Sequence, residues 1–325
     1  MKKGAKWSLG ITVVLIVLAG LWAAAFAVAK LAGGGTGDGP AAGYNEEILR
    51  DADNGTSDKV VMINVVGEIF SDPDGGLEGA TDSNIIGQLD RAVDDPDTKA
   101  IIIQLETPGG GVVASDGIYE RVREVSKEED IPVIALMGDV AASGGYYIAA
   151  GADEIVAHPS TWTGSIGVIA MLPNFEKAAD KLGIGLTVIK SGALKDAGSP
   201  FRQMTPQEQS LFQTLINEAY DGFVKVVADG RELDEAKVRE LADGRIYSGK
   251  QAKEVKLVDF LGDLDLAFER AKKLADIEDA VLVRYTADVG FGDILGVTSQ
   301  RLRKTSLQQE LGIARRPGAS YLWIP

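Results

Sequence analysis

A chain of 325 residues with 48 acidic and 33 basic side chains carries a formal net charge of -15, which argues against binding to the phosphate backbone of a nucleic acid. It contains no cysteine, so disulfides and thiolate metal sites are excluded, and its one histidine excludes a zinc site built from two or three imidazoles. The length is enough for one large α/β domain or two smaller ones.

An uncharged run from Trp7 to Ala29 stands near the start of the chain, with three lysines in front of it at positions 2, 3 and 6. As a helix rising about 1.5 Å per residue it would span roughly 34 Å, more than the hydrocarbon core of a bilayer. Because basic flanks face the cytoplasm, we expect residues 1–6 inside, a single-pass anchor at 7–29, and the rest of the chain on the outer side of the cell membrane.

Two other interpretations of this run remain open. Ala27-Val28-Ala29 fits the small-residue cleavage site of a signal peptide, although the run is long for one. A buried core helix is the third interpretation, and soluble helices seldom stay uncharged for this length. The glycine-rich stretch Gly33–Gly43 then predicts a flexible linker over residues 30–57.

Short apolar runs alternate with helical spacing over the next part of the chain. Strands are predicted at 60–66, 100–105, 132–137 and 186–190, apolar runs occur at 155–157 and 166–172, and helices are predicted at 84–93, at 113–125 and from Ser143. Such alternation is typical of a parallel or mixed sheet covered by helices. We therefore predict an α/β domain over residues 58–285, built from repeated strand-helix units.

Longer amphipathic helices follow and predict a helical flank: Pro206–Asp229, Asp234–Ala242 and Asp263–Leu274. A last strand is predicted at Val281–Tyr285, and residues 286–325 form a tail. The apolar end of that tail, Tyr321–Pro325, is expected to pack against the domain or a partner subunit.

Two glycine-rich turns follow predicted strands, Thr107–Gly111 and Ala141–Tyr147. Ligands of open α/β sheets bind at the carboxyl ends of strands, where glycines let backbone N–H groups approach a reacting oxygen. Ser143 in the second turn is therefore the candidate nucleophile. The alternative is that Ser143 only caps its helix. A phosphate cradle is a poor alternative, because neither turn contains Gly-Lys-Ser or Gly-Lys-Thr.

A serine nucleophile needs a base to accept its proton. His158 follows a short strand and precedes Pro159, and we interpret it as structural, which leaves a carboxylate or a lysine. Lys195 stands among small residues whose close packing could desolvate it, and a lysine pKa of about 10.4 must fall by about 3 units, which full burial can supply. Lys190 is the competing candidate for the general base. Asp196 would raise the pKa of Lys195 if it pointed at the amine, so we expect it to point elsewhere.

At these residues the chain resembles the signal peptide peptidase A family, membrane-anchored Ser/Lys proteases that share the fold of Clp protease and crotonase. Four segments in order carry the resemblance, which spans most of residues 59–275: Glu106–Gly111, Ala141–Tyr147, Thr163–Val168 and Lys190–Asp196. The helical segment Tyr247–Ala252 also matches the wider superfamily and supports the fold rather than the chemistry.

The resemblance implies a role for each matching residue. Ser143 would be the nucleophile and Lys195 the general base, with Ser165 orienting the lysine. The backbone N–H groups of Gly110 and Ser143 would form the oxyanion hole. Glu106 departs from the family, which often has a small polar or Asn-like residue there, so hydrogen bonding to the substrate is in question at that position.

The family has a double-length and a half-length form, and this chain is of the half-length kind. The resemblance then implies a ring or dome, of eight subunits, in which Ser143 of one protomer meets Lys195 of its neighbour. It implies a membrane-anchored serine endopeptidase without a cofactor, acting on remnant signal peptides and other unfolded apolar chains. The alternatives are an acyl-CoA enzyme of the crotonase type, which needs no serine nucleophile, and a non-catalytic membrane scaffold.

Overall fold

The computed structural model describes residues 43–72, 79–287 and 320–322. The expected anchor at 7–29 lies outside these ranges, as do residues 1–6 and most of the tail. Among the residues that are described, no helix combines the length and apolar character needed to cross a membrane.

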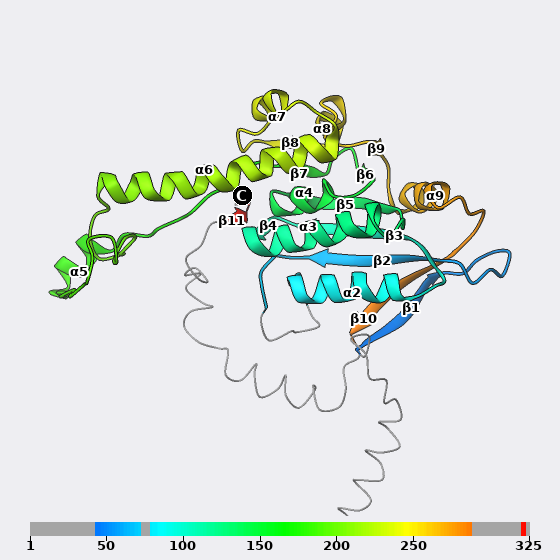
Figure 1. Cartoon of the computed structure of the whole chain (residues 1–325), viewed down its shortest axis with the longest axis horizontal. Helices are drawn as coiled ribbons and strands as arrows, with labels where there is room; N and C mark the ends of the chain where they lie inside the picture. Colours follow the sequence, from blue (N-terminus) through cyan, green and yellow to red (C-terminus); the bar gives the residue numbers. More distant parts are fainter. Residues whose placement is uncertain (1–42, 73–78, 288–319, 323–325) are drawn as a thin grey trace, which may run out of the picture. The chain divides into compact units, whose positions relative to one another are not determined.

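Strands and helices alternate along the described chain (Figure 1). The strands are β1 (Tyr44–Arg50), β2 (Lys59–Val66), β3 (Thr98–Thr107), β4 (Gly109–Gly111), β5 (Val133–Ala142), β6 (Glu154–Ala157), β7 (Trp162–Gly164), β8 (Ile246–Ser248), β9 (Phe260–Leu261), β10 (Val281–Ala287) and β11 (Ser320–Leu322). The helices are α2 (Asp82–Asp94), α3 (Val112–Lys127), α4 (Gly144–Ala149), α5 (Glu176–Lys181), α6 (Pro206–Arg231), α7 (Glu235–Leu241), α8 (Gly249–Glu254) and α9 (Leu264–Leu274).

The main sheet has the strand order β1-β10-β2-β3-β5-β6-β9. Neighbours from β10 to β9 run parallel, and β1 joins β10 antiparallel at the edge. The far end of β5 pairs in parallel with β7, which pairs antiparallel with β8. This mixed, mainly parallel α/β architecture confirms the predicted fold class and fits a Clp protease-like fold.

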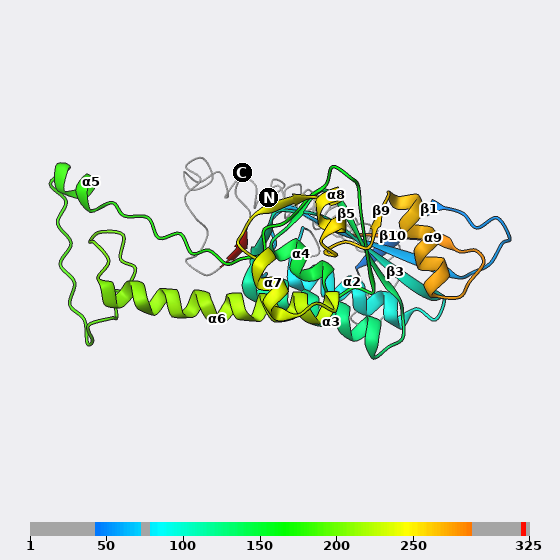
Figure 2. The ribbon, with the colours of Figure 1, turned by 90° about the horizontal axis from the view of Figure 1, so that it is seen from above.

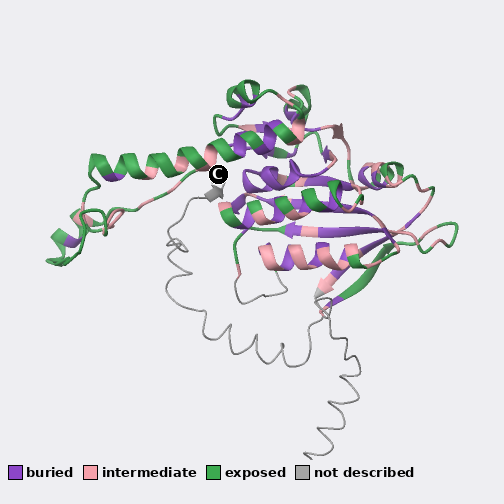
Figure 3. Cartoon of the chain, viewed as in Figure 1, coloured by how far each residue is buried: buried purple, intermediate pink, exposed green. Residues whose placement is uncertain are grey.

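Alternating residues of the central strands pack on opposite faces of the sheet, as strand geometry requires. Val61 and Ile63 of β2 belong to the large core that includes side chains of α2, α3, α4 and α6. Val60 and Met62 belong to a second core with Phe268 of α9. Burial of each such side chain stabilises the fold by roughly 1.5–3 kcal/mol. Because apolar side chains point from both faces of the sheet, helices cover both faces. Figure 3 shows the buried strands.

Two predicted segments differ from the structure, and one apolar run to which no element was assigned is irregular. Tyr44–Arg50 of the expected linker is strand β1, because it pairs with β10 and buries Tyr44. The apolar run 166–172 is not a regular strand, although Ile166 is buried. Residues 186–190 also lack strand pairing, and Ile189 is 96% exposed. An apolar run becomes a strand only where a partner strand supplies hydrogen bonds, and none of the described strands pairs with 186–190.

Helix α6 begins with a complete capping box. The Thr205 side chain accepts a hydrogen bond from the Glu208 N–H, the Glu208 side chain accepts from the Thr205 N–H, and Pro206 occupies the first turn. Its second half buries Phe223 and Val227 in the large core, whereas its first half is largely exposed (Figure 3). Figures 1 and 2 both show α6 running from this packed end toward α5.

Candidate active site

Ser143 lies in the tight turn between β5 and α4, as the sequence predicts for a nucleophile. Its backbone has φ 54° and ψ -114°, a conformation that an L-residue adopts only under strain. Within the described ranges its hydroxyl makes no cap hydrogen bond to α4, so the helix-cap alternative is wrong. The residue is 1% exposed. Strain at a serine that does not cap its helix is typical of a functional residue.

Gly110 lies in β4, directly against Ile69. The Gly111 N–H donates to the Ile69 carbonyl at 2.8 Å, and the Ile69 N–H donates to the Gly109 carbonyl at 2.9 Å. A Cβ on Gly110 would lie 1.9 Å from the Ile69 oxygen, so only glycine fits. A Cβ on Gly144 would lie 3.2 Å from the Gly110 nitrogen, which shows how closely the residue after Ser143 approaches β4. The fold thus brings Gly110 beside the nucleophile turn.

The Ser143 N–H, which we expected in the oxyanion hole, donates instead to the Gly164 carbonyl at 2.8 Å. The reason is local: Gly164 ends β7, which pairs with the last residues of β5 just before Ser143. An N–H that is already hydrogen-bonded stabilises an oxyanion only after that bond opens. The role of the Ser143 N–H in the oxyanion hole therefore stays a prediction, and it requires this hydrogen bond to open.

Ser165 directly follows β7 and is held in a second strained conformation, with φ 49°. Its N–H donates to the Arg245 carbonyl at 2.8 Å, and the residue is 8% exposed. Ser143 and Ser165 both line one pocket of about 470 Å³. The structure therefore brings together Ser143, Ser165 and the turn that contains Gly110.

The remaining wall of this pocket comes from residues to which no sequence motif gave a role in the site. They are Gly167–Ile169 after β7, Gln213, Ile216, Asn217 and Tyr220 of α6, and Ala242–Gly244 after α7. The wall combines apolar side chains with two amide side chains from α6 and with Asp243. Amphipathic spacing in the sequence does predict α6, but which of its faces reaches Ser143 depends on packing between segments about 70 residues apart.

Lys195 is not one of the pocket-lining residues. It lies in a turn at residues 191–199, and it is exposed rather than packed among small side chains. The expectation that its own segment desolvates the lysine is therefore wrong for the single chain, because the neighbouring residues 191–194 are exposed as well. Among the described residues its ammonium has no hydrogen-bond or ion-pair partner.

Asp196 points away from Lys195, which confirms the expectation for this carboxylate. It accepts hydrogen bonds from Lys190 at 2.5 Å and from Arg202 at 2.8 Å. Hydrogen bonds from Arg202 first, and then from Lys190, hold the pKa of Asp196 well below its ordinary value. Lys190, the competing candidate for the base, is thus ion-paired with this carboxylate.

His158 and Glu106 have structural roles. His158 is exposed in the turn after β6, where its Nδ1 accepts the Ser160 N–H at 3.2 Å. Glu106 accepts the Asp139 N–H at 2.7 Å and so fixes the irregular part of β5 instead of facing the pocket. Over the described ranges 43–72, 79–287 and 320–322, no group of three or more histidine or acidic side chains could hold a metal ion.

The C-terminal strand β11 lies beside the glycine turn. It pairs antiparallel with β4, and Tyr321 lies opposite Gly110. This confirms that part of the apolar end packs against the domain. It also shows that the edge of β4 accepts an extended peptide backbone.

Comparison with known proteins identifies the family. The model of the family described as "Peptidase family S49" matches residues 125–278. A putative signal peptide peptidase SppA of Enterococcus faecium is 36% identical over 298 residues, which are 86% of this chain and 86% of that protein. The chain belongs to peptidase family S49. This confirms the resemblance to signal peptide peptidase A and supports a serine-type peptidase.

Two further relatives of this S49 peptidase each match about two thirds of the chain. A putative protease of Synechocystis sp. is 41% identical over 223 residues, 69% of this chain and 76% of the relative. Protease 4 of Haemophilus influenzae is 36% identical over 218 residues, 67% of this chain but only 35% of that protein. The chain thus matches about a third of this longer relative.

Proposed function

We propose that the chain is a membrane-anchored serine endopeptidase in which Ser143 and Lys195 form a catalytic dyad. The observation that carries this proposal is the state of Ser143. It is strained and buried, it lines a pocket, and its hydroxyl does not serve the helix that it precedes. Residues 7–29 would supply the anchor, and the catalytic domain would lie on the outer side of the cell membrane.

The reaction proceeds through an acyl-enzyme. Neutral Lys195 accepts the Ser143 hydroxyl proton as Oγ attacks the scissile carbonyl, and the Gly110 N–H stabilises the resulting oxyanion. The Ser143 N–H becomes the second donor when its bond to Gly164 opens. The protonated lysine then gives its proton to the leaving amine, and the C–N bond breaks. Lys195 next activates a water that hydrolyses the ester, while the Ser165 hydroxyl orients the amine.

The position of Lys195 supports a site shared between copies of the chain. The lysine lies outside the Ser143 pocket of its own chain, which supports a site in which the Lys195 of a neighbouring copy reaches Ser143. The segment before it exposes alternating apolar side chains that a soluble monomer would bury: Leu182, Ile184, Leu186 and Val188. A series of exposed apolar side chains of this kind is typical of an interface, and covering it would also exclude water from the lysine. We propose a closed ring or dome, of eight subunits.

The proposed substrates are remnant signal peptides and other unfolded apolar chains. The pocket beside Ser143 has apolar walls formed in part by Val168, Ile216 and Tyr220, which fit an aliphatic side chain next to the cleaved bond. Pairing of β11 with β4 supports binding of the substrate as an added strand. A folded protein cannot present such a free extended segment.

Co-expression of two inactive variants tests the dyad and the sharing together. The full chain in detergent is assayed on an unfolded protein as wild type, Ser143→Ala, Lys195→Ala, and a co-expressed mixture of the two variants. Each single variant is expected to lose activity by at least about 10³-fold. In a ring with randomly mixed subunits, about a quarter of the sites would combine an intact Ser143 with an intact Lys195 from the neighbour.

The outcomes separate the parts of the proposal. Cleavage by either single variant at the rate of the wild type would refute the dyad. Inactive single variants together with an inactive, fully assembled mixture would refute the shared site while leaving the dyad intact. Turnover of a CoA ester by the wild type would favour the crotonase alternative.

A further inference from the structure

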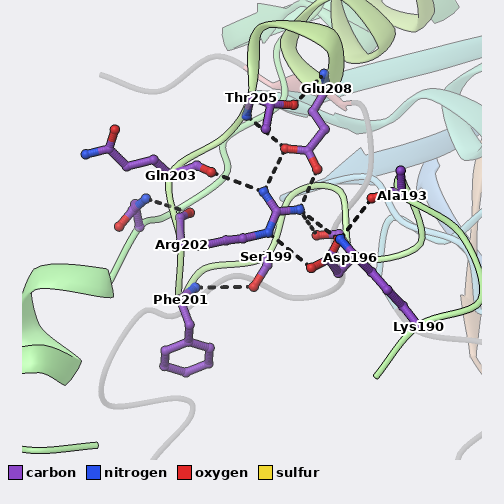
Figure 4. A network of polar contacts seen from close by, with 10 residues as sticks. Lys190, Ala193, Asp196, Ser199, Phe201, Arg202, Gln203, Thr205 and Glu208 are labelled. Carbon is purple, nitrogen blue, oxygen red and sulfur yellow. Dashed lines mark hydrogen bonds and ion pairs between the residues drawn. The ribbon is translucent and has the colours of Figure 1, made fainter. Parts of the chain in front are cut away.

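We propose that Arg202 is a positioning residue for the Lys195 base: it fixes the turn that carries the lysine and keeps the Asp196 carboxylate away from the amine. This inference rests on the proposed function of Lys195. Figure 4 shows the arrangement, with the Arg202 guanidinium between Asp196 and Glu208.

The turn at residues 191–199 has little structure of its own. It contains neither helix nor strand, and its backbone hydrogen bonds are local. The Lys195 N–H donates to Gly192 O at 3.1 Å, and the Ser199 N–H donates to Asp196 O at 3.1 Å. Such bonds close single turns but do not fix the direction of the turn in space. The direction of the lysine therefore depends on contacts made from outside the turn.

Arg202 makes those contacts on one side. Its Nε donates to Asp196 Oδ2 at 3.1 Å and its Nη2 donates to Asp196 Oδ1 at 2.8 Å, which is the two-pronged geometry that arginine and a carboxylate form. The same Nη2 donates to the Asp196 backbone carbonyl at 3.0 Å. Arg202 thus holds both the side chain and the main chain of the residue next to Lys195.

On its other side Arg202 binds the start of α6. Its Nη1 donates to Glu208 Oε2 at 2.9 Å, and its Nη2 is hydrogen-bonded to Glu208 Oε1. Glu208 is 1% exposed and belongs to the capping box with Thr205. Further along, α6 supplies Ile216 and other residues to the Ser143 pocket. One rigid helix therefore carries both a pocket wall and, through Arg202, the lysine turn.

The charges of this cluster balance. The charged groups around the turn are Lys190 and Arg202, which are cations, and Asp196 and Glu208, which are anions. The pKa of Asp196 is lowered chiefly by Arg202, so this carboxylate is ionised at any pH at which the enzyme could work. Loss of Arg202 would leave the Asp196 carboxylate with one cationic partner fewer. This carboxylate belongs to the residue next to Lys195. A free carboxylate near the amine favours the charged ammonium, which is not a base.

The test is the pH dependence of kcat/KM for the full chain, whose acid limb reports the ionisation of the base in the free enzyme. Arg202→Gln is expected to move this limb to higher pH by about 1 unit, a roughly tenfold loss of rate at a fixed pH below the limb. The double variant Arg202→Gln/Asp196→Asn removes one charge of each sign, and the limb is expected to return to the wild-type position. The matched control is Arg239→Gln. Arg239 is an exposed arginine of α7 that binds Asp221 of α6, and the acid limb of this variant is expected not to move.

A merely structural role for Arg202 would lower the rate at every pH and leave the limb in place, and that result would overturn the proposal. A double variant whose limb stays shifted would overturn it as well. If Arg202→Gln does not fold, the single variant Asp196→Asn tests the electrostatic argument. Loss of the Asp196 charge is expected to move the acid limb to lower pH. A limb that does not move refutes the argument. Full activity of Lys195→Ala would instead refute the proposed function, whatever Arg202 does.

Discussion

Replacement of Gly110 by alanine tests whether this glycine positions the oxyanion donor. A Cβ at this position would lie 1.9 Å from the Ile69 oxygen and 2.6 Å from the Ile69 carbon and nitrogen, all of which are backbone atoms. Because contacts of a Cβ below 3.0 Å are essentially never found, β4 and Ile69 must separate by about 1.1 Å. The backbone of β4 cannot swing aside as a side chain would, so the Gly110 N–H must move.

A displacement of this size is large on the scale of catalysis. Oxyanion donors act at about 2.7–3.1 Å, and loss of one typically costs 10²–10³-fold in rate, or roughly 2.7–4 kcal/mol of transition-state stabilisation. A misplacement of about 1 Å has a comparable cost, on the order of 10²-fold. We therefore expect Gly110→Ala to lose about 10²–10³-fold in kcat/KM, and to lose about 1–3 kcal/mol of stability from the strained packing.

Gly111→Ala is the matched control, because the same methyl group one residue later meets only the Ile69 oxygen, at 3.9 Å. Gly111 has φ -62° and ψ 134°, which alanine also adopts. Its activity is expected to stay within about threefold of wild type. Both variants are assayed by steady-state cleavage of an unfolded protein, with thermal unfolding to confirm that they fold. A folded Gly110→Ala variant with activity close to that of the control would refute the oxyanion role.

Three further changes have expected outcomes. Ser143→Gly should abolish cleavage and yet raise the stability by about 1 kcal/mol, because glycine adopts φ 54° without strain; thermal unfolding measures this. In α6, Gly222→Ala should stabilise the protein by up to about 1 kcal/mol, since none of the described residues comes within 4 Å of its Cβ. Gly230→Ala should destabilise the protein, since its Cβ would lie 2.0 Å from the Ala150 oxygen; denaturant titration compares the two variants. The hydrogen bonds from Arg202 lower the pKa of Glu208 to about 2. This carboxylate therefore stabilises the start of α6 above about pH 4.3 and loses that effect as the pH falls toward 2. The protection of the first turns of α6 against hydrogen exchange, relative to the unfolded chain at the same pH, should fall over that window.

Each of these expectations has an opposing result. A Ser143→Gly variant less stable than wild type would show that the serine conformation is not strained. Equal effects of Gly222→Ala and Gly230→Ala would contradict the close contact between α6 and α4. Unchanged protection of the start of α6 against hydrogen exchange from about pH 4 to pH 2 would show that ionised Glu208 does not stabilise this turn.

Much of the fold could be predicted because its signals are local. The apolar run of β2 and the helical spacing of α2, α3 and α9 lie within windows of about ten to sixteen residues, and their boundaries agree with the structure to within a few residues. Predictions failed where a partner decides the state of a segment. Tyr44–Arg50 is a strand because β10 pairs with it, and residues 186–190 are not a strand because none of the strands that the structure describes pairs with them.

The same distinction applies to the candidate site. The sequence alone determined the chemical types available: one serine in a glycine turn after a strand, lysines in place of histidine, and no thiol. Only the tertiary structure decided that Ser143 does not cap α4, that its N–H is taken by Gly164, and that the pocket is completed by α6. It also decided that Lys195 stays exposed in the single chain. Residue type is a property of one position, whereas burial, distance and an available hydrogen bond depend on segments that are far apart in the chain and meet only on folding.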